Sequence, residues 1–437
     1  MIKIDFTKEI GKIKAMHGVG QPPLYGFGND CYFRYLTDAH IPYSRLHDTL
    51  GTYDFRVVEI PNIFRDFDAD ENDPASYDFV FTDWLIGALM KAGCEPVYRL
   101  GVSIENYAAM KAYRIFPPKD NAKWARICEH IIRHYNEGWA DGFTYGIKYW
   151  EIWNEPEDGE ESQMWFGSAQ EYYDLYVTTA KHLKACFGDS IRVGGYASCG
   201  FYAEIGEKAP DWAMIGTRFQ YYVEYFHNFL KHIKAENAPI DFFSWHSYAQ
   251  PEGTAAMAEY AKKTLTEYGY SDVELHLNEW NTAPDPELRG TSFASATAAA
   301  MMLLMQNTKT DVLCYYDAAI SVVDYAGLFD PLSRKPCCTY YAFKAFGELF
   351  ALGTQVECCA DETVAAIAAT DGSRNAVMLA NLGEDVKLET NLDASRFVVY
   401  LIDEDHFFTP TELNPMRFTL KKNQVAFISD DTVSICE

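Results

Sequence analysis

The stretch Tyr149-Trp150-Glu151-Ile152-Trp153-Asn154-Glu155-Pro156 has the pattern of a short strand that ends in polar residues. Aromatic and β-branched residues favour extended backbone, and the proline stops the strand because it cannot donate to a sheet. The pleat relaxes at the end of a strand, so Asn154 and Glu155 can both reach the same edge of the sheet. The way this unit repeats along the chain decides the fold.

A rhythm of apolar strand, polar or aromatic end and helical run recurs from about residue 13 to residue 350. The expected strands are Lys14–Val19, Tyr43–His47, Glu95–Leu100, Ile147–Trp153, Ile191–Tyr196, Asp241–Ser247, Glu274–Asn278 and Val312–Tyr316. Helical runs between them include Thr82–Ala92, Trp124–Tyr135, Ala169–Cys186, Tyr222–Ala235 and Ser292–Gln306. Strands alternating with helices predict parallel pairing, and eight such units close a (β/α)₈ barrel, an α/β TIM-barrel fold.

An open doubly wound sheet is the alternative for this pattern. Such a sheet usually has a glycine-rich phosphate-binding turn after its first strand. The corresponding turn here is His17-Gly18-Val19-Gly20-Gln21-Pro22-Pro23, and its two prolines do not suit a helix that starts at a pyrophosphate. The pattern therefore favours the barrel.

The rhythm changes after about Leu352. The segments Thr363–Thr370, Arg374–Asn381, Arg396–Ile402 and Gln424–Ile428 resemble strands that are separated by turns and by no long helix. The first strand, Ile2–Phe6, precedes the barrel and needs a partner. We therefore expect a barrel domain over residues 13–350, and an antiparallel β-sandwich domain made of residues 1–12 and 351–437.

The composition excludes several classes of partner. The formal net charge of −26 repels phosphate backbones and anionic lipid, so neither nucleic acid nor a membrane is expected. No apolar run approaches the roughly 18 residues of a membrane span, and no signal peptide is recognised. The 11 cysteines show no metal-type spacing, and together with the lack of a recognised signal peptide they favour a cytoplasmic location. Homo-oligomerisation stays open.

A second carboxylate stands at the end of the seventh expected strand, in Leu275-His276-Leu277-Asn278-Glu279-Trp280-Asn281. Strands four and seven lie nearly opposite each other in an eight-stranded barrel, so Glu155 and Glu279 can face each other across its mouth. Two opposed carboxyl groups suit acetal cleavage. A separation of about 5–5.5 Å allows direct attack and retention, whereas about 6.5–9.5 Å leaves room for a water and inversion.

The motifs also resemble a known group of enzymes. Trp153-Asn154-Glu155-Pro156 resembles the acid/base motif of the clan A glycoside hydrolases, and Leu277-Asn278-Glu279-Trp280-Asn281-Thr282 resembles their nucleophile strand. Within that clan the chain is similar to family thirty-nine, the β-xylosidase and α-L-iduronidase family. The resemblance implies a retaining glycosidase with Glu279 as nucleophile, Glu155 as general acid/base, no cofactor and a glycoside or oligosaccharide substrate.

The same resemblance implies roles for four further residues. Arg45 matches the arginine that helps to keep the nucleophile ionised, and Asn154 matches the asparagine that binds the hydroxyl beside the anomeric carbon. His246 and Tyr248 match the strand-six pair, in which the tyrosine orients the nucleophile.

Other residues are weaker candidates for sugar contacts, each balanced by a structural role. His17 and His47 stand near the ends of the first two strands, Trp165 follows the acid/base loop, and Trp280 stands beside the nucleophile. Tyr316 occupies the end of strand eight, where the clan usually has a tryptophan that forms the floor of the sugar site. This departure leaves the sugar open.

Several functions remain in competition. The first is a β-xylosidase-like exo-glycosidase, and the second is the same mechanism on an arabinofuranoside, a uronide or an exopolysaccharide, with Arg99 as a candidate uronate ligand. A catalytically silent carbohydrate-binding barrel is the third. A metal-dependent hydrolase is not expected, because the strand ends lack the usual ligand arrangement.

Overall fold

The computed structural model describes residues 1–25, 30–46, 58–102, 116–157, 164–214, 216–283, 285–320, 325–360 and 363–433. Eight parallel strands form a closed barrel, because β2 pairs with both β3 and β9. They are β2 (Ala15–Gly20), β3 (Tyr43–Leu46), β4 (Glu95–Leu100), β5 (Tyr149–Ile152), β6 (Arg192–Ser198), β7 (Phe242–Ser247), β8 (Glu274–Trp280) and β9 (Val312–Tyr316). The predicted (β/α)₈ barrel is confirmed.

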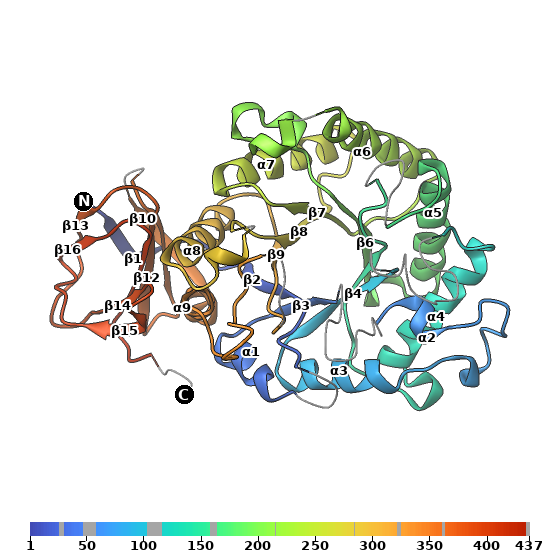
Figure 1. Ribbon diagram of the computed structural model, residues 1–437, viewed down its shortest axis with the longest axis horizontal. Coiled ribbons are helices and arrows are strands. Elements are labelled where there is room, and N and C mark those ends of the chain that lie inside the picture. The colour runs from blue at the N-terminus through green and yellow to red at the C-terminus, as the bar shows by residue number, and fades with distance from the viewer. Residues whose placement is uncertain are drawn as a thin grey trace.

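Helices surround the barrel on its outside (Figure 1). They are α1 (Arg34–Asp38), α2 (Ile60–Ile63), α3 (Val80–Lys91), α4 (Asn121–Asn136), α5 (Ala169–Phe187), α6 (Arg218–Ala235), α7 (Pro251–Glu267), α8 (Ser292–Gln306) and α9 (Cys338–Leu352). Their starts follow the local chemistry: Ser168 and Glu171 form a capping box at α5, and Asp120 accepts two backbone N–H groups at α4. No helix of the described chain is long and apolar enough to cross a membrane.

Antiparallel sheets lie beside the barrel, at the left of Figure 1. One sheet has the order β1-β10-β11-β12-β17-β14-β15, and a smaller sheet pairs β13 with β16. The strands are β1 (Lys3–Lys12), β10 (Thr354–Cys359), β11 (Ala365–Thr370), β12 (Asn375–Asn381), β13 (Val386–Glu389), β14 (Val398–Ile402), β15 (Phe407–Thr411), β16 (Arg417–Leu420) and β17 (Gln424–Ser429). The amino-terminal strand thus pairs with the carboxyl-terminal region, as expected.

The larger sheet buries both of its faces. On one face Val377 and Leu379 pack with Leu388 and Phe418 of the smaller sheet, which makes the predicted β-sandwich. On the other face Met378 belongs to the core that the sheet shares with the barrel helices, and α8 and α9 lie against it. Alternation of side chains along each strand produces this division.

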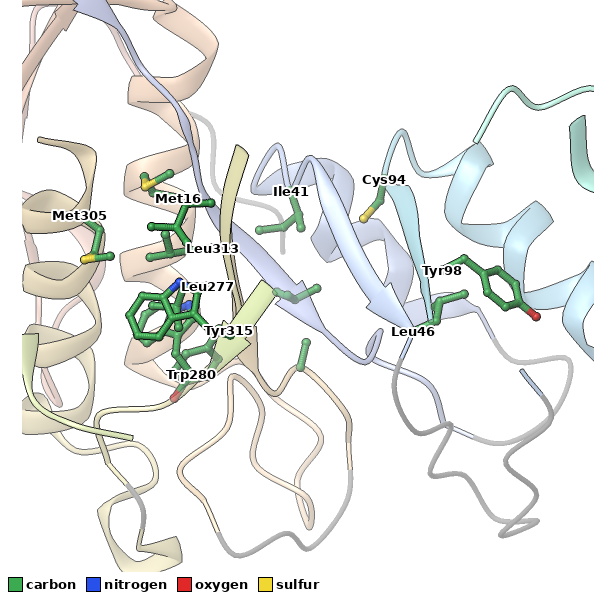
Figure 2. Close-up of a cluster of buried hydrophobic side chains, with 14 of the residues drawn as sticks. Met16, Ile41, Leu46, Cys94, Tyr98, Leu277, Trp280, Met305, Leu313 and Tyr315 are labelled. Atoms are coloured by element: carbon green, nitrogen blue, oxygen red, sulfur yellow. The ribbon is translucent and has the colours of Figure 1, made fainter. Parts of the chain in front are cut away.

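A dense apolar layer also separates the barrel strands from the helices outside them (Figure 2). Trp280 lies in this layer with Leu277 of the same strand and Tyr315 of β9, and Met305 of α8 lies nearby. The layer holds the strand ends rigidly, so it fixes the direction in which the polar side chains at the mouth project.

Candidate active site

The chain turns sharply after β5, so that Asn154 and Glu155 both face the barrel mouth. Trp153 and Glu155 have φ angles of 74° and 46°, in the left-handed region that residues other than glycine rarely adopt. The Trp153 ring turns outward against Trp165, with ring centroids 5.0 Å apart. The backbone N–H of Glu155 points to the carbonyl oxygens of Tyr196 and Ala197, at 3.2 and 3.1 Å. Strained backbone of this kind is held by its surroundings, and it concentrates at functional sites.

A bulge at the end of β8 has a similar effect. The pairing with β7 matches Trp245 to Leu277 and His246 to Glu279, so Asn278 is the extra residue. Asn278 donates its amide to Glu151 inside the barrel, and Glu279 also faces inward. Both strand ends therefore bring an Asn-Glu pair to the mouth.

The Arg45 guanidinium, buried at the end of β3, connects the two strand ends. Its Nε donates to Glu151 at 2.8 Å, one Nη donates to Glu279 at 3.1 Å, and the other donates to the Asn154 Oδ1 at 2.5 Å. Burial opposes ionisation of Glu151, but the Arg45 charge together with hydrogen bonds from Ser244 and Arg45 lowers the pKa of that carboxyl. The second oxygen of Glu279 accepts a hydrogen bond from the Tyr248 hydroxyl at 2.6 Å.

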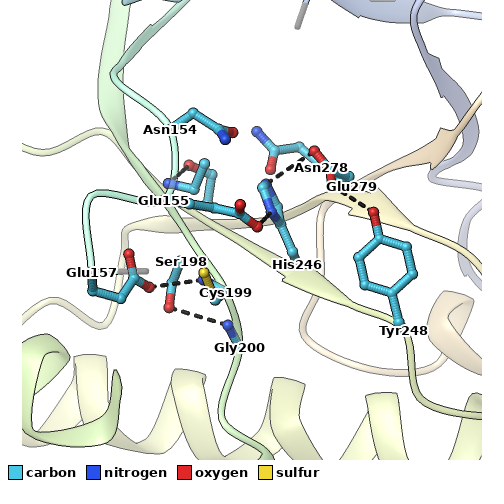
Figure 3. A network of polar contacts seen from close by, with 12 residues as sticks. Asn154, Glu155, Glu157, Ser198, Cys199, Gly200, His246, Tyr248, Asn278 and Glu279 are labelled. Atoms are coloured by element: carbon cyan, nitrogen blue, oxygen red, sulfur yellow. Dashed lines mark hydrogen bonds and ion pairs between the residues drawn. The ribbon is translucent and has the colours of Figure 1, made fainter. Parts of the chain in front are cut away.

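The surroundings of Glu155 are different (Figure 3). Its Oε1 lies 2.6 Å from the Nδ1 of His246, and the other nitrogen of that ring lies 3.8 Å from Glu279. Burial lowers the pKa of His246 to about 4, so the imidazole is neutral near pH 7. Burial also raises the pKa of Glu155 to about 7, against the opposing effect of Arg45. With 21% of its side chain exposed, Glu155 can still reach a ligand in the mouth.

The two carboxyl groups lie close together. One oxygen of Glu155, one oxygen of Glu279 and one nitrogen of His246 all lie within 4.8 Å of one another. These three atoms could ligate a metal ion, but the Arg45 charge beside Glu279 opposes a second cation there. A similar cluster of Glu129, His182 and Cys186 lies on α4 and α5, where Arg133 already donates to Glu129 at 2.7 Å.

Three of the sequence-predicted contacts do not lie at the mouth. The His17 ring nitrogen lies 2.9 Å from the His40 carbonyl oxygen, and the ring packs on Phe346 and Phe350. Trp280 is fully buried against Tyr315 and Phe343. Trp165 is 2% exposed, and its ring packs edge-on against Trp153 and Tyr172. These expectations are corrected: the three side chains pack in the protein interior.

The remaining candidates differ in position. Tyr316, at the end of β9, is partly exposed and its hydroxyl accepts a hydrogen bond from Gln21 at 3.1 Å. Arg99 is fully buried 3.8 Å from Glu59, which gives it a structural ion pair rather than a place beside a uronate. His47 lies outside the described residues.

Sequence reasoning missed three buried carboxyl groups near the mouth. Glu151 is the ion-pair partner of Arg45, Glu157 follows the acid/base motif, and Asp317 follows Tyr316. Burial raises the pKa of Glu157 to about 8 and that of Asp317 to about 7. The available signal was position, because Glu151 and Asp317 lie within one residue of a barrel-strand end and Glu157 lies five residues after β5, but position alone does not show burial.

Comparisons with known proteins agree with this geometry. The model of glycosyl hydrolases family 39 matches residues 41–324. A β-xylosidase of Geobacillus stearothermophilus is 23% identical over 285 residues, which cover 58% of this chain and 48% of that enzyme. The chain thus spans about half the length of this curated relative.

Solved structures share the fold over nearly the full length. A glucosidase from Croceicoccus marinus superposes with a TM-score of 0.78 at 22% identity, covering 98% of each chain. A monomeric β-xylosidase from Caulobacter crescentus superposes with a TM-score of 0.70 at 16% identity, with the same coverage. The match to the family model extends over more than half of the residues and includes both strand-end carboxylates. The chain therefore belongs to glycosyl hydrolase family 39.

Proposed function

We propose that this glycosidase cleaves its substrate with retention, with Glu279 as nucleophile and Glu155 as general acid/base. The short separation of the two carboxyl groups carries the proposal, because their nearest oxygens lie within 4.8 Å. That gap suits direct attack of one carboxylate on the anomeric carbon, and it is too short to seat the water that inversion requires.

The surroundings of each carboxyl group support the division of roles. In the first step Glu279 attacks the anomeric carbon, the bond to the leaving oxygen breaks, and Glu155 gives that oxygen its proton. In the second step Glu155 takes a proton from water, the hydroxide attacks the anomeric carbon, and Glu279 leaves. The raised pKa of Glu155, about 7, suits a group that must donate and then accept.

Four neighbours would assist these steps. Arg45 and Tyr248 both donate to Glu279, one to each carboxylate oxygen, which fixes the direction of that carboxylate. The Asn154 amide nitrogen is buried without a hydrogen-bond partner among the described residues, so it can donate to the sugar hydroxyl beside the anomeric carbon. His246, neutral and 2.6 Å from Glu155, would hold the acid without adding a charge.

For the substrate we propose a β-xyloside, cleaved from the end of a short oligosaccharide. The support is the similarity to the Geobacillus and Caulobacter β-xylosidases. The glucosidase neighbour makes a β-glucoside the alternative. We also propose that residues 13–350 carry the catalysis, and that residues 1–12 with 351–437 form the accessory domain, since β1 pairs with β10.

A panel of aryl glycosides tests the sugar, and the anomer of the first product tests the stereochemistry. The purified enzyme is given aryl β-xyloside, β-glucoside, α-arabinofuranoside and β-glucuronide, and the released sugar is followed by ¹H NMR before it mutarotates. We expect the β-xyloside to give the highest kcat/KM and β-xylose to appear first. Initial α-xylose would overturn retention, and a preference for another glycoside would overturn the sugar alone.

A further inference from the structure

Glu157 is a buried carboxyl group for which the mechanism above has no role. It lies two residues beyond Glu155, and only 1% of it is exposed. Its Oε1 accepts a hydrogen bond from the backbone N–H of Cys199 at 2.8 Å (Figure 3). Cys199 directly follows Ser198, the last residue of β6. Glu157 therefore ties the segment after β5 to the neighbouring strand.

This tie reinforces a strained position. Glu155 has the left-handed φ of 46°, and its own N–H points to the carbonyl oxygens of Tyr196 and Ala197 of β6. A non-glycine residue in this conformation costs about 1–2 kcal/mol, so neighbouring contacts must hold it there. The segment is thus held to β6 twice, by the Glu155 backbone and by the Glu157 side chain.

The surroundings of Glu157 favour its uncharged form. Its Oε2 has no hydrogen-bond partner within the described residues, which an ionised carboxylate would need. Burial raises its pKa to about 8, and the nearby Glu155 acts in the same direction. The other titratable groups that face it are also uncharged near pH 7: Cys199, Tyr172, Tyr173, Tyr196, Tyr222 and Tyr225.

We propose that Glu157 is a positioning residue, which as a neutral carboxylic acid fixes the acid/base segment on β6 so that Glu155 presents its proton to the leaving group. The inference rests on the proposed role of Glu155. A neutral acid can accept the Cys199 N–H without placing a second negative charge beside Glu155, whereas an ionised one would repel it.

Leaving-group dependence tests this role, because only poor leaving groups need a proton from the acid. The kcat/KM values for a 2,4-dinitrophenyl and a phenyl glycoside are compared in Glu157→Ala, Glu157→Met, Glu157→Gln and Glu155→Gln. Glu157→Ala and the space-filling Glu157→Met should lose at least about 10-fold more with the phenyl glycoside. Glu157→Gln should restore most of that loss, since its amide oxygen can accept the Cys199 N–H.

Glu95→Ala is the matched control. The Glu95 carboxyl also has a raised pKa through burial and also accepts a backbone N–H, that of Lys148 at 2.8 Å, but it lies at the opposite end of the barrel strands. Its loss should affect both leaving groups equally. The positioning role would be overturned if Glu157→Ala and Glu157→Met each lost the same factor with both leaving groups, or lost no activity. Failure of Glu157→Gln to restore the loss would overturn it as well. If Glu155→Gln itself shows no leaving-group dependence, the proposed acid/base role fails instead.

Discussion

The two sides of the barrel mouth surround the same kind of side chain with opposite electrostatics. On the β8 side, Glu279 receives a charged donor from Arg45 and a hydroxyl donor from Tyr248. On the β5–β6 side, Glu155 contacts a neutral imidazole, and the nearby Glu157 is itself an acid with a raised pKa. Fixed donors favour an ionised carboxylate, while burial without a bonded cation favours a protonated one.

This difference teaches how one residue type can take two roles. Glu155 and Glu279 are the same residue type, so only their neighbours can give them different roles. Arg45 bonds directly to Glu279 of β8, and on the β5 side to Glu151 and Asn154. Glu155 receives only its longer-range field. Substitutions on the two sides of the mouth should therefore have different effects.

The largest effect should follow loss of the proposed nucleophile. Glu279→Ala should lower kcat for every aryl glycoside by about 10⁴-fold or more, because no group remains to form the covalent intermediate. Glu274→Gln is the control, since Glu274 stands at the other end of the same strand and accepts from Tyr149 at 2.8 Å. Substantial residual turnover in pure Glu279→Ala would contradict the assignment.

Loss of the proposed acid should be severe but selective. Glu155→Gln should lower kcat/KM for a phenyl glycoside by about 10²- to 10⁴-fold, and far less for a 2,4-dinitrophenyl glycoside. Added azide should rescue the second step by attacking the glycosyl-enzyme without base catalysis. A uniform loss without azide rescue would place the acid elsewhere.

The wild-type pH profile should report the protonation of Glu155. Because its pKa is raised to about 7, the proton needed for the first step is present below that pH and is lost above it. We expect kcat/KM for a phenyl glycoside to fall about tenfold per pH unit above the midpoint. A plateau that extends beyond pH 9 would show that Glu155 is not the group that must be protonated.

A smaller effect should follow from the hydroxyl on the β8 side. Tyr248→Phe removes the 2.6 Å hydrogen bond to Glu279 and should lower kcat by about 10- to 100-fold, the size expected for a bond to a charged group. Tyr260→Phe of α7, which loses a hydroxyl 3.0 Å from His227, should leave kcat unchanged. An unchanged kcat in Tyr248→Phe would mean that Arg45 alone orients Glu279.

The smallest effect on activity should come from Trp280. Because its ring packs between β9 and α9 rather than at the mouth, Trp280→Phe should leave KM within about twofold while it lowers the free energy of unfolding by about 0.5–3 kcal/mol. Thermal unfolding and steady-state kinetics separate the two quantities. A large rise in KM with an unchanged Tm would place Trp280 back among the sugar contacts.

The barrel could be predicted from the sequence because strand–helix alternation is a local pattern. All eight expected strands begin within two residues of those observed, and β3, β4, β8 and β9 begin at the expected residue. The two catalytic candidates were found in the same way, because the Asn-Glu pairs mark strand ends. That they face each other follows from the barrel closing between β2 and β9.

The direction of individual side chains could not be predicted, because it depends on breaks in the pleat. The bulge at Asn278 turns Glu279 inward and leaves Trp280 facing the helices, and the left-handed Trp153 sends its ring outward. His17 lies in mid-strand, three residues before β2 ends. A strict alternation of period two gives no sign of these changes.

The account depends most on a covalent bond at Glu279. The enzyme is incubated with a 2,4-dinitrophenyl 2-deoxy-2-fluoro-β-xyloside, whose fluorine slows the second step, and its peptides are then sequenced by mass spectrometry. We predict stoichiometric labelling of Glu279, with loss of activity that returns when a glycosyl acceptor is added. Complete turnover of the reagent without a label, or a label on Glu155 or Asp317, would contradict the proposed mechanism.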